Sequence, residues 1–143
     1  MKLLFDSCVF IDAFDPDSPN HAESLQLLEI LASKEVSVVM PAHGWFEVQC
    51  SLQKLGADRR FAGPTLKGNM QYELKLIHID DKFIQKYSMA EIPYIKAGDH
   101  IFLAVAKVDG YSLVTSDGKM KQIGAACGVQ VFSPAEAIRE ATQ

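Results

Sequence analysis

Short apolar runs alternate with segments of helical length from one end of this chain to the other. A chain with this alternation folds as a parallel sheet covered by helices, because a helix must carry the backbone across the sheet between two parallel strands. The runs with the length and composition of buried strands are Lys2 to Phe5, Val36 to Met40, Leu74 to His78, Tyr111 to Thr115 and Gln130 to Phe132. We therefore predict an α/β fold of three layers, α/β/α, whose central parallel sheet has about five short strands.

Helical signals fill the segments between these runs. The predicted helices are His21 to Ser33, a helix from about Pro41 to a stop at Gly56, Ala97 to Val108, and Pro134 to Ala141 after Ser133 as N-cap. The residues expected to face the core are Leu25, Leu28 and Leu31 or Leu27, then Trp45, Val48, Leu52 and Leu55, and finally Ile101, Val105 and Val108. No repeat or linker rich in Pro, Gly or Ser divides the chain, so residues 1–143 are predicted to form a single domain.

Two acids follow predicted strands. Asp6 ends the first apolar run and precedes Ser7, and Asp117 follows the run that ends at Thr115. In an open α/β sheet, the carboxyl ends of the strands form the edge where ligands bind. Each acid also has a purely structural interpretation, because Asp6 can cap the following helix and Asp117-Gly118 is a common turn pair.

Two further acids lie in predicted helices. Asp99 opens the helix that begins near Ala97, where an acid is also favoured because it opposes the helix dipole. Glu47 falls off the buried stripe of its own helix, so its side chain is free to point into solvent or into a cleft. Each signal is weak alone, and their ordered arrangement along the chain is what indicates one acidic site.

The acids lie in four short segments, 3–11, 41–47, 99–106 and 113–117. Their sequences are LLFDSCVFI, PAHGWFE, DHIFLAVA and LVTSD. They resemble the four ordered motifs of the PIN-domain family, which includes the VapC-type toxins. The resemblance spans almost the whole chain in the right order and implies a PIN-like fold.

The resemblance also implies a site and an activity. The four motif acids would form one catalytic site that binds Mg²⁺ or Mn²⁺, from Asp6, Glu47, Asp99 and Asp117. Neighbouring hydroxyl groups would support it, from Ser7, Thr115 and Ser116. The implied activity is that of a metal-dependent endoribonuclease, which hydrolyses RNA phosphodiester bonds and leaves a 5′-phosphate and a 3′-hydroxyl.

Basic residues in the irregular segment from Gly56 to Tyr72 are candidates to contact the RNA backbone, namely Arg59, Arg60 and Lys67. We expect this segment to form an arm or loop beside the site. The chain departs from the family at Lys119, where some members carry a further acid, and at Met120, where an aromatic residue is common. These departures leave a site with one bound ion as an alternative to a site with two.

Two other functions compete with the ribonuclease. A PIN-like protein with reduced catalysis could act as an RNA-binding or protein-interaction module, although all four acids are present. A phosphatase of the haloacid dehalogenase type would need Asp-x-Asp after the first strand, and Cys8 occupies the second of these positions. A catalytic histidine is disfavoured because no HxxxH or HExxH motif and no cluster with cysteine occurs.

Composition limits the partners and the location. The net charge of −4 and the pI of about 5.5 argue against binding nucleic acid by a bulk positive field, but clustered acids of a metal-dependent nuclease produce the same balance. The apolar runs are too short to span a bilayer, and an acid interrupts the first run, so we expect a cytoplasmic protein without a membrane role. The resemblance implies a toxin that pairs with a small antitoxin and forms a homodimer.

The cysteines are odd in number, far apart and without a CxxC pair: Cys8, Cys50 and Cys127. This spacing indicates neither a disulfide framework nor a structural zinc site. We expect reduced thiols that pack as small apolar residues.

Overall fold

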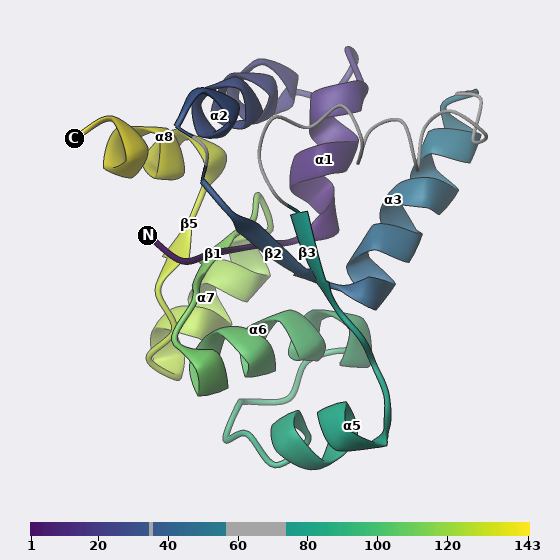
Figure 1. Ribbon diagram of the computed structural model, residues 1–143, viewed down its shortest axis with the longest axis vertical. Helices are drawn as coiled ribbons and strands as arrows, with labels where there is room; N and C mark the ends of the chain where they lie inside the picture. Colours follow the sequence, from purple (N-terminus) through teal and green to yellow (C-terminus); the bar gives the residue numbers. More distant parts are fainter. Residues whose placement is uncertain (35, 57–73) are drawn as a thin grey trace.

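A five-stranded parallel sheet forms the centre of the protein (Figure 1). The computed structural model describes residues 1–34, 36–56 and 74–143. The strands lie in the order β3-β2-β1-β4-β5 and are all parallel. Their bounds are β1 Leu3–Phe5, β2 Val38–Pro41, β3 Leu74–Ile77, β4 Ser112–Val114 and β5 Val131–Phe132. The predicted sheet is confirmed, with strand ends that shift by one or two residues.

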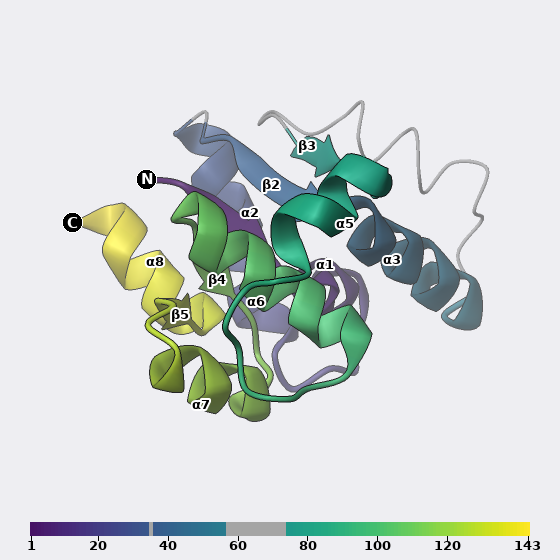
Figure 2. The same ribbon diagram turned by 90° about the horizontal axis from the view of Figure 1, so that it is seen from below.

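Helices cover both faces of this sheet (Figures 1 and 2). One face carries α1 Ser7–Phe14, α2 His21–Ser33, α3 Ala42–Lys54 and α8 Pro134–Thr142. The other carries α5 Asp81–Tyr87, α6 Ala97–Asp109 and α7 Gly118–Ala126. The chain adds β2 and then β3 on one side of β1, and afterwards adds β4 and then β5 on the other side. Because each crossover is right-handed, the two groups of helices lie on opposite faces of the sheet. The predicted three-layer α/β/α architecture is therefore confirmed.

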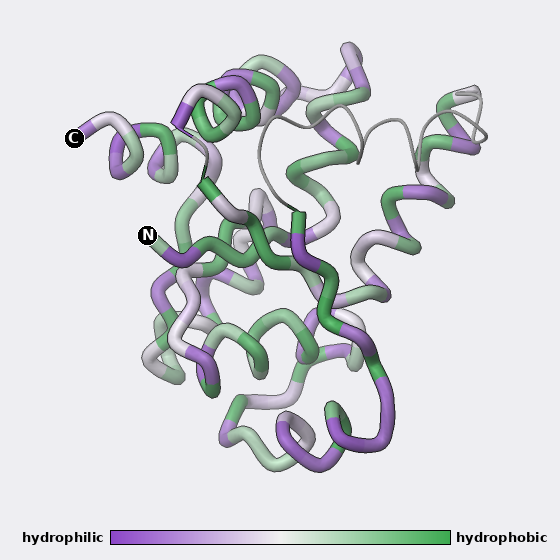
Figure 3. The backbone as a smooth tube through the Cα atoms, viewed as in Figure 1, coloured by the Kyte–Doolittle hydropathy of each residue, from purple (hydrophilic) through white to green (hydrophobic). Residues whose placement is uncertain are grey.

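The core lies between the sheet and these helices. Every residue of β1 and β2 is buried, because both faces of a parallel sheet are covered and no solvent side remains. In α6 the five residues from Phe102 to Ala106 are all buried. Figure 3 shows the same pattern, with apolar strands at the centre and hydrophilic residues concentrated in α5 and the outer part of α3. Among the described residues, no helix combines the length and apolar character needed to cross a lipid bilayer.

The helix boundaries predicted from periodicity are close, but three residues expected to face the core are exposed: Leu25, Leu55 and Val108. In α2 the contacts with both α1 and α8 turn the buried face toward Leu27, Leu28 and Leu31. Leu55 lies at the C-cap, beyond the last residue of α3, and Val108 lies in the last turn of α6. Pro41 was predicted to lie in the first turn of α3. It is instead the last residue of β2 and the N-cap of that helix.

The C-terminal helix begins as predicted. Ser133 is the N-cap of α8, where its hydroxyl accepts from the backbone N–H of Glu136 at 3.2 Å, and the Glu136 carboxylate accepts from the Ser133 N–H at 2.7 Å. Lys121 donates to both carboxylate oxygens of Glu136 at 2.6 Å. The positive charge of Lys121 is thus already paired with this capping box.

Phe10 tests the core that supports the fold. Its fully buried ring packs 5.7 Å from the ring of Phe5 and edge-on to Trp45 at 5.6 Å. We expect Phe10→Ala to lower the free energy of unfolding by about 3–5 kcal/mol, because it removes a buried aromatic ring and leaves a cavity. Phe46→Ala is the matched control, since Phe46 is 67% exposed and its loss should change the stability by less than about 0.5 kcal/mol. If urea unfolding shows the same loss in the free energy of unfolding for both variants, the described core is contradicted.

Candidate active site

The candidate site lies at the carboxyl edge of the sheet, where β1 and β4 end side by side. Phe5 is in register with Val114, so the residues that follow each strand are neighbours. The backbone N–H of Asp6 donates to the carbonyl of Val114 at 3.0 Å and extends this pairing by one residue. Parallel pairing therefore brings Asp6 and Thr115 together although they are 109 positions apart in the chain.

Asp6 is the buried acid of the site. Its residue is only 6% exposed, and it occupies the N-cap position of α1 without making a side-chain cap hydrogen bond. Its carboxylate accepts instead from the Thr115 hydroxyl at 2.7 Å and from the Ser7 hydroxyl at 3.3 Å. A carboxylate that is buried beside neutral donors keeps strong affinity for a cation. The helix-cap interpretation of Asp6 therefore does not describe what its side chain does.

Thr115 connects Asp6 to the next acid. Its hydroxyl donates to Asp6 and accepts from the backbone N–H of Asp117 at 3.0 Å, so the turn after β4 is held against the buried carboxylate. Asp117 is the N-cap of α7, and its Oδ1 accepts from the N–H groups of Lys119 and Met120 at 2.8 and 3.3 Å. Asp117 is thus a helix cap at the site edge, which orients its carboxylate.

Glu47 reaches the site from the middle of α3. Its side chain is 49% exposed, and the Ser7 hydroxyl lies 3.4 Å from its Oε2, so that Ser7 lies between Glu47 and Asp6. Burial raises the pKa of Glu47, nearby His43 opposes this rise, and the negative charge of Asp6 adds to it. Glu47 therefore points toward the other acids and is repelled by them.

Asp99 enters from the first turn of α6. Its pKa is raised mainly by burial, and then by the negative charges of Asp6 and Asp117. The ammonium groups of Lys96 and Lys119 act in the opposite direction. Acids from four separate segments thus share one electrostatic environment, in which each raises the cost of charging another.

Cys8 is a site residue that the sequence did not reveal. Its thiol lies 3.4 Å from Asp6 Oδ2, as a donor, and accepts from the backbone N–H of Ser116 at 3.4 Å. Burial, followed by the charge of Asp6, raises its pKa to about 12, so the thiol stays neutral. All three cysteines are free, as expected, but the packing expectation is wrong for Cys50, which is exposed. The signal in the sequence was the position of Cys8, two residues after the acid that follows the first strand.

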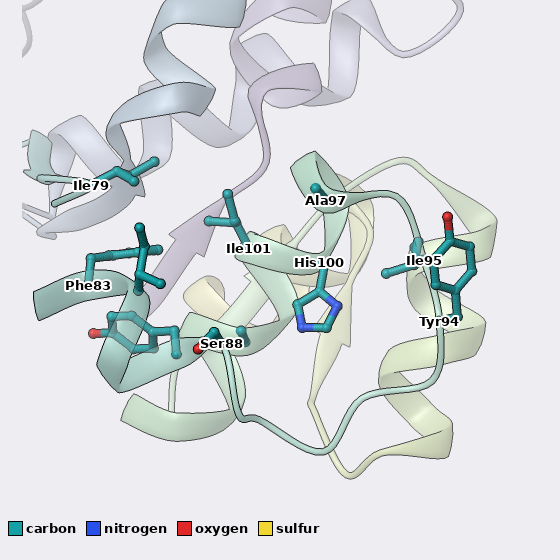
Figure 4. Close-up of a pocket in the computed structure, with 11 residues that line it drawn as sticks. Ile79, Phe83, Ser88, Tyr94, Ile95, Ala97, His100 and Ile101 are labelled. Atoms are coloured by element: carbon teal, nitrogen blue, oxygen red, sulfur yellow. The ribbon is translucent and has the colours of Figure 1, made fainter. Parts of the chain in front are cut away.

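His43 is the second residue that the sequence left outside the site. Its Nε2 lies 2.9 Å from the carbonyl of Gly98 and 3.6 Å from Glu47 Oε1. The spacing of four residues between His43 and Glu47 on one helix was the signal for this contact. His100, although it follows Asp99, instead faces an apolar cavity of about 410 Å³ between α5 and α6 (Figure 4).

The remaining predicted residues have different outcomes. Ser116 is near the site through its backbone, while its hydroxyl is buried with no hydrogen-bond partner among the described residues. The basic candidates in the irregular segment lie outside the described residues: Arg59, Arg60 and Lys67. The cavity between α5 and α6 holds no carboxylate in its lining, so it is separate from the acidic site.

The donor set suits a hard divalent cation. All candidate ligands are carboxylate oxygens, and charge repulsion among them would be relieved by a cation. Within the described part of the chain, no three side chains from His, Cys, Asp or Glu are close enough together to ligate one ion as they stand. Mg²⁺ does not require such a cluster, because it keeps several waters and usually binds one or two carboxylates.

Sheet and site together define an α/β protein with a carboxylate site at the carboxyl edge of a parallel sheet. The sequence model of the PIN domain matches residues 3–126. The chain therefore belongs to the PIN domain family, and the family resemblance found in the four motifs is confirmed. No curated protein sequence is significantly similar to this chain.

Solved structures share this fold. VapBC2 from Rickettsia felis, bound to a promoter DNA fragment, has a TM-score of 0.64 and 16% identity, over 93% of this chain and 98% of that chain. VapC20 from Mycobacterium tuberculosis, a toxin that cleaves the sarcin-ricin loop, has a TM-score of 0.65 and 16% identity, over 86% and 95%. FitAcB from Neisseria gonorrhoeae has a TM-score of 0.62 and 20% identity, over 93% and 98%. At these identities the likeness concerns the fold.

Burial of Asp99, together with charge repulsion at the site, predicts a pH-dependent stability. The folded pKa of Asp99 is raised, so its stabilising contribution is complete below the unfolded value of 3.8 and is lost as the pH rises through the folded pKa. At pH 7 without metal, Asp99→Asn should therefore raise Tm, by about 2 °C. The difference should shrink as the pH falls through the folded pKa and disappear below pH 3.8, as measured by thermal unfolding in EDTA.

Asp81→Asn is the matched control for this prediction. Asp81 also lies in the first turn of a helix, α5, but outside the acidic site. Loss of its favourable interaction with the helix dipole should leave Tm unchanged or slightly lower. If both variants shift Tm equally, the burial and repulsion of Asp99 within the site are not the cause.

Proposed function

We propose that this PIN domain protein is a metal-dependent endoribonuclease, the toxin of a toxin–antitoxin pair. The observation that carries the proposal is the state of Asp6. Its buried carboxylate lies at the N-cap of α1 but makes no capping hydrogen bond. Among the described residues, the groups that donate to it are all neutral: the side chains of Ser7, Cys8 and Thr115. A carboxylate buried in this way costs stability, which is expected where a cation completes the site.

The residues that would hold Mg²⁺ or Mn²⁺ are Asp6, Glu47, Asp99 and Asp117. A divalent cation supplies activation of water and neutralises charge on a phosphodiester. The chain supplies the orientation of the ligands, because Thr115 holds one oxygen of Asp6 and Ser7 lies between Asp6 and Glu47. Cys8 fills the space beside Asp6 with a neutral group and adds no charge to the site.

Basic residues would bind the RNA backbone at the edge of the site. Lys96 and Lys119 act electrostatically on Asp99, so their charges lie near the path of a phosphate bound there. Lys119 also occupies the position of a further acid in some relatives, which favours a single firmly bound ion. Arg59, Arg60 and Lys67 remain proposed contacts to RNA.

Size and the similar structures support the toxin assignment. This chain covers 95–98% of the VapBC2, VapC20 and FitAcB chains, so the similarity extends over almost all of each. VapC20 is a toxin that cleaves the sarcin-ricin loop, and a further similar structure, from Klebsiella pneumoniae, is a toxin–antitoxin complex. We propose the same kind of partner here, a small antitoxin, together with a cytoplasmic homodimer.

The alternative is a module that binds RNA or protein with little catalysis. It is favoured by the lack of a preformed three-ligand cluster among the described residues and by Lys119 at the position of an acid. Metal binding separates the two functions, because a module that has lost catalysis does not need a cation at these acids.

Cleavage of RNA tests the proposed function. Purified protein with a panel of single-stranded and structured RNAs should show cleavage that depends on Mg²⁺ or Mn²⁺ and stops in EDTA. Asp6→Asn and Asp99→Asn should reduce the rate by about 100-fold or more, since each removes a negatively charged ligand. Asp81→Asn should cleave like the original protein. Cleavage that persists in EDTA, or in both site variants, would be evidence against this site.

Cation binding tests the site without a substrate. Mn²⁺ at 100 times its dissociation constant should stabilise the fold by about 2.7 kcal/mol, because it binds the folded state alone. The stabilisation should be absent in Asp6→Asn and retained in Asp81→Asn, as measured by thermal unfolding over a Mn²⁺ series. Binding without cleavage of any RNA in the panel would leave the site supported and place the error in the choice of substrate. No stabilisation in any form would favour the binding module.

A further inference from the structure

His43 connects the two helices that carry Glu47 and Asp99. It lies in the first turn of α3, and its Nε2 is 2.9 Å from the carbonyl oxygen of Gly98 in the first turn of α6. A carbonyl can only accept, so Nε2 carries the proton and donates this hydrogen bond. Gly98 directly precedes Asp99, and the bond therefore acts on the backbone that positions that acid.

The same imidazole contacts the acid on its own helix. His43 Nε2 is 3.6 Å from Glu47 Oε1, one helical turn away. The ring also packs on Phe102 of α6, with centroids 4.7 Å apart and planes at 43°. One side chain thus touches Glu47, the carbonyl before Asp99 and the core of α6.

The other ring nitrogen makes no such contact. Nδ1 of His43 is buried and has no hydrogen-bond partner among the described residues. Donation from Nε2 to the Gly98 carbonyl is therefore the hydrogen bond that holds this ring among the described residues.

Side-chain packing between the two helices accompanies this contact. A Cβ atom on Gly44 would lie 2.8 Å from Cζ of Phe102 and 3.1 Å from Cγ of Met40, so the Phe102 ring of α6 packs directly against Gly44 and would have to shift for a larger residue. Gly44 is buried, and His43 precedes it in the first turn of α3. The Phe102 ring thus fills the space beside Gly44, and the bond from His43 to Gly98 links the first turns of α3 and α6.

We propose that His43 is a positioning residue that fixes the separation of the Glu47 and Asp99 carboxylates and thereby the affinity of the site for a divalent cation. The inference rests on the proposed function, because it concerns the same four acids. His43 does not ligate the cation in this role. It acts through the Gly98 carbonyl and through Glu47.

Three substitutions at His43 separate its hydrogen bond from its packing. His43→Phe keeps an aromatic ring against Phe102 and removes the N–H. His43→Gln keeps an N–H donor at a similar reach, and His43→Asn has the same amide on a shorter side chain. His100→Gln is the matched control, because His100 follows Asp99 but faces the apolar cavity between α5 and α6 (Figure 4).

The experiment is a Mn²⁺ titration by calorimetry, with the metal-free Tm of each variant measured alongside. We expect His43→Phe and His43→Asn to bind Mn²⁺ about 10-fold more weakly than the original protein, the size of effect seen when a group that orients ligands is lost. His43→Gln should recover most of the affinity, and His100→Gln should bind normally. For His43→Phe the loss of affinity should occur without a matching loss of metal-free Tm, since this variant keeps the ring contact with Phe102.

The outcomes distinguish this inference from the proposed function. No Mn²⁺ binding by the original protein overturns the proposed function and the inference with it. Normal binding by the original protein and by His43→Phe overturns the inference alone, as does equal weakening in His43→Gln and His43→Asn. If His43→Phe does not fold, the comparison of the glutamine and asparagine variants decides.

Discussion

The parallel pairing of β1 with β4 is the contact on which the site depends. It sets Asp6 beside Thr115, and the backbone bond from Asp6 to Val114 carries the ladder one residue past the strand. Because parallel strands end at the same edge, the helices that follow them begin there as well. This holds for α1, α3 and α7, which follow strands directly, whereas α6 follows α5 and carries Asp99 in its first turn. The dipoles of these helices favour negative charge at their N-termini.

The charges of the site lower the stability of the fold. Asp6 is buried without a basic partner among the described residues, and burial and repulsion raise the pKa of Glu47 and Asp99. Neutral groups fill the space that counter-charges would otherwise occupy, with Thr115, Ser7 and Cys8 all acting as donors to Asp6. Such uncompensated charge is common at functional sites, where a ligand supplies the missing opposite charge.

Helices from the two opposite faces of the sheet both contribute acids to the candidate site. α3 covers one face and carries Glu47, whereas α6 covers the other and carries Asp99. The Phe102 ring of α6 packs on Gly44 of α3, and His43 donates to the Gly98 carbonyl. The apolar cavity between α5 and α6 lies on a different side of α6 and has no acids in its lining. The helix α6 thus lies between the acidic site and the apolar cavity.

The sequence by itself determined the α/β class, the five parallel strands and the order of the four acidic segments. These features follow from apolar periodicity and from the rule that ligands gather at the carboxyl ends of parallel strands, both of which are local or topological. Only the tertiary structure decided that Asp6 leaves its helix uncapped, that Cys8 and His43 belong to the site, and that Leu25, Leu55 and Val108 face solvent. The physical reason is distance along the chain: a hydrogen bond such as that from Thr115 to Asp6, or the face on which α2 meets α8, depends on residues that no local pattern connects.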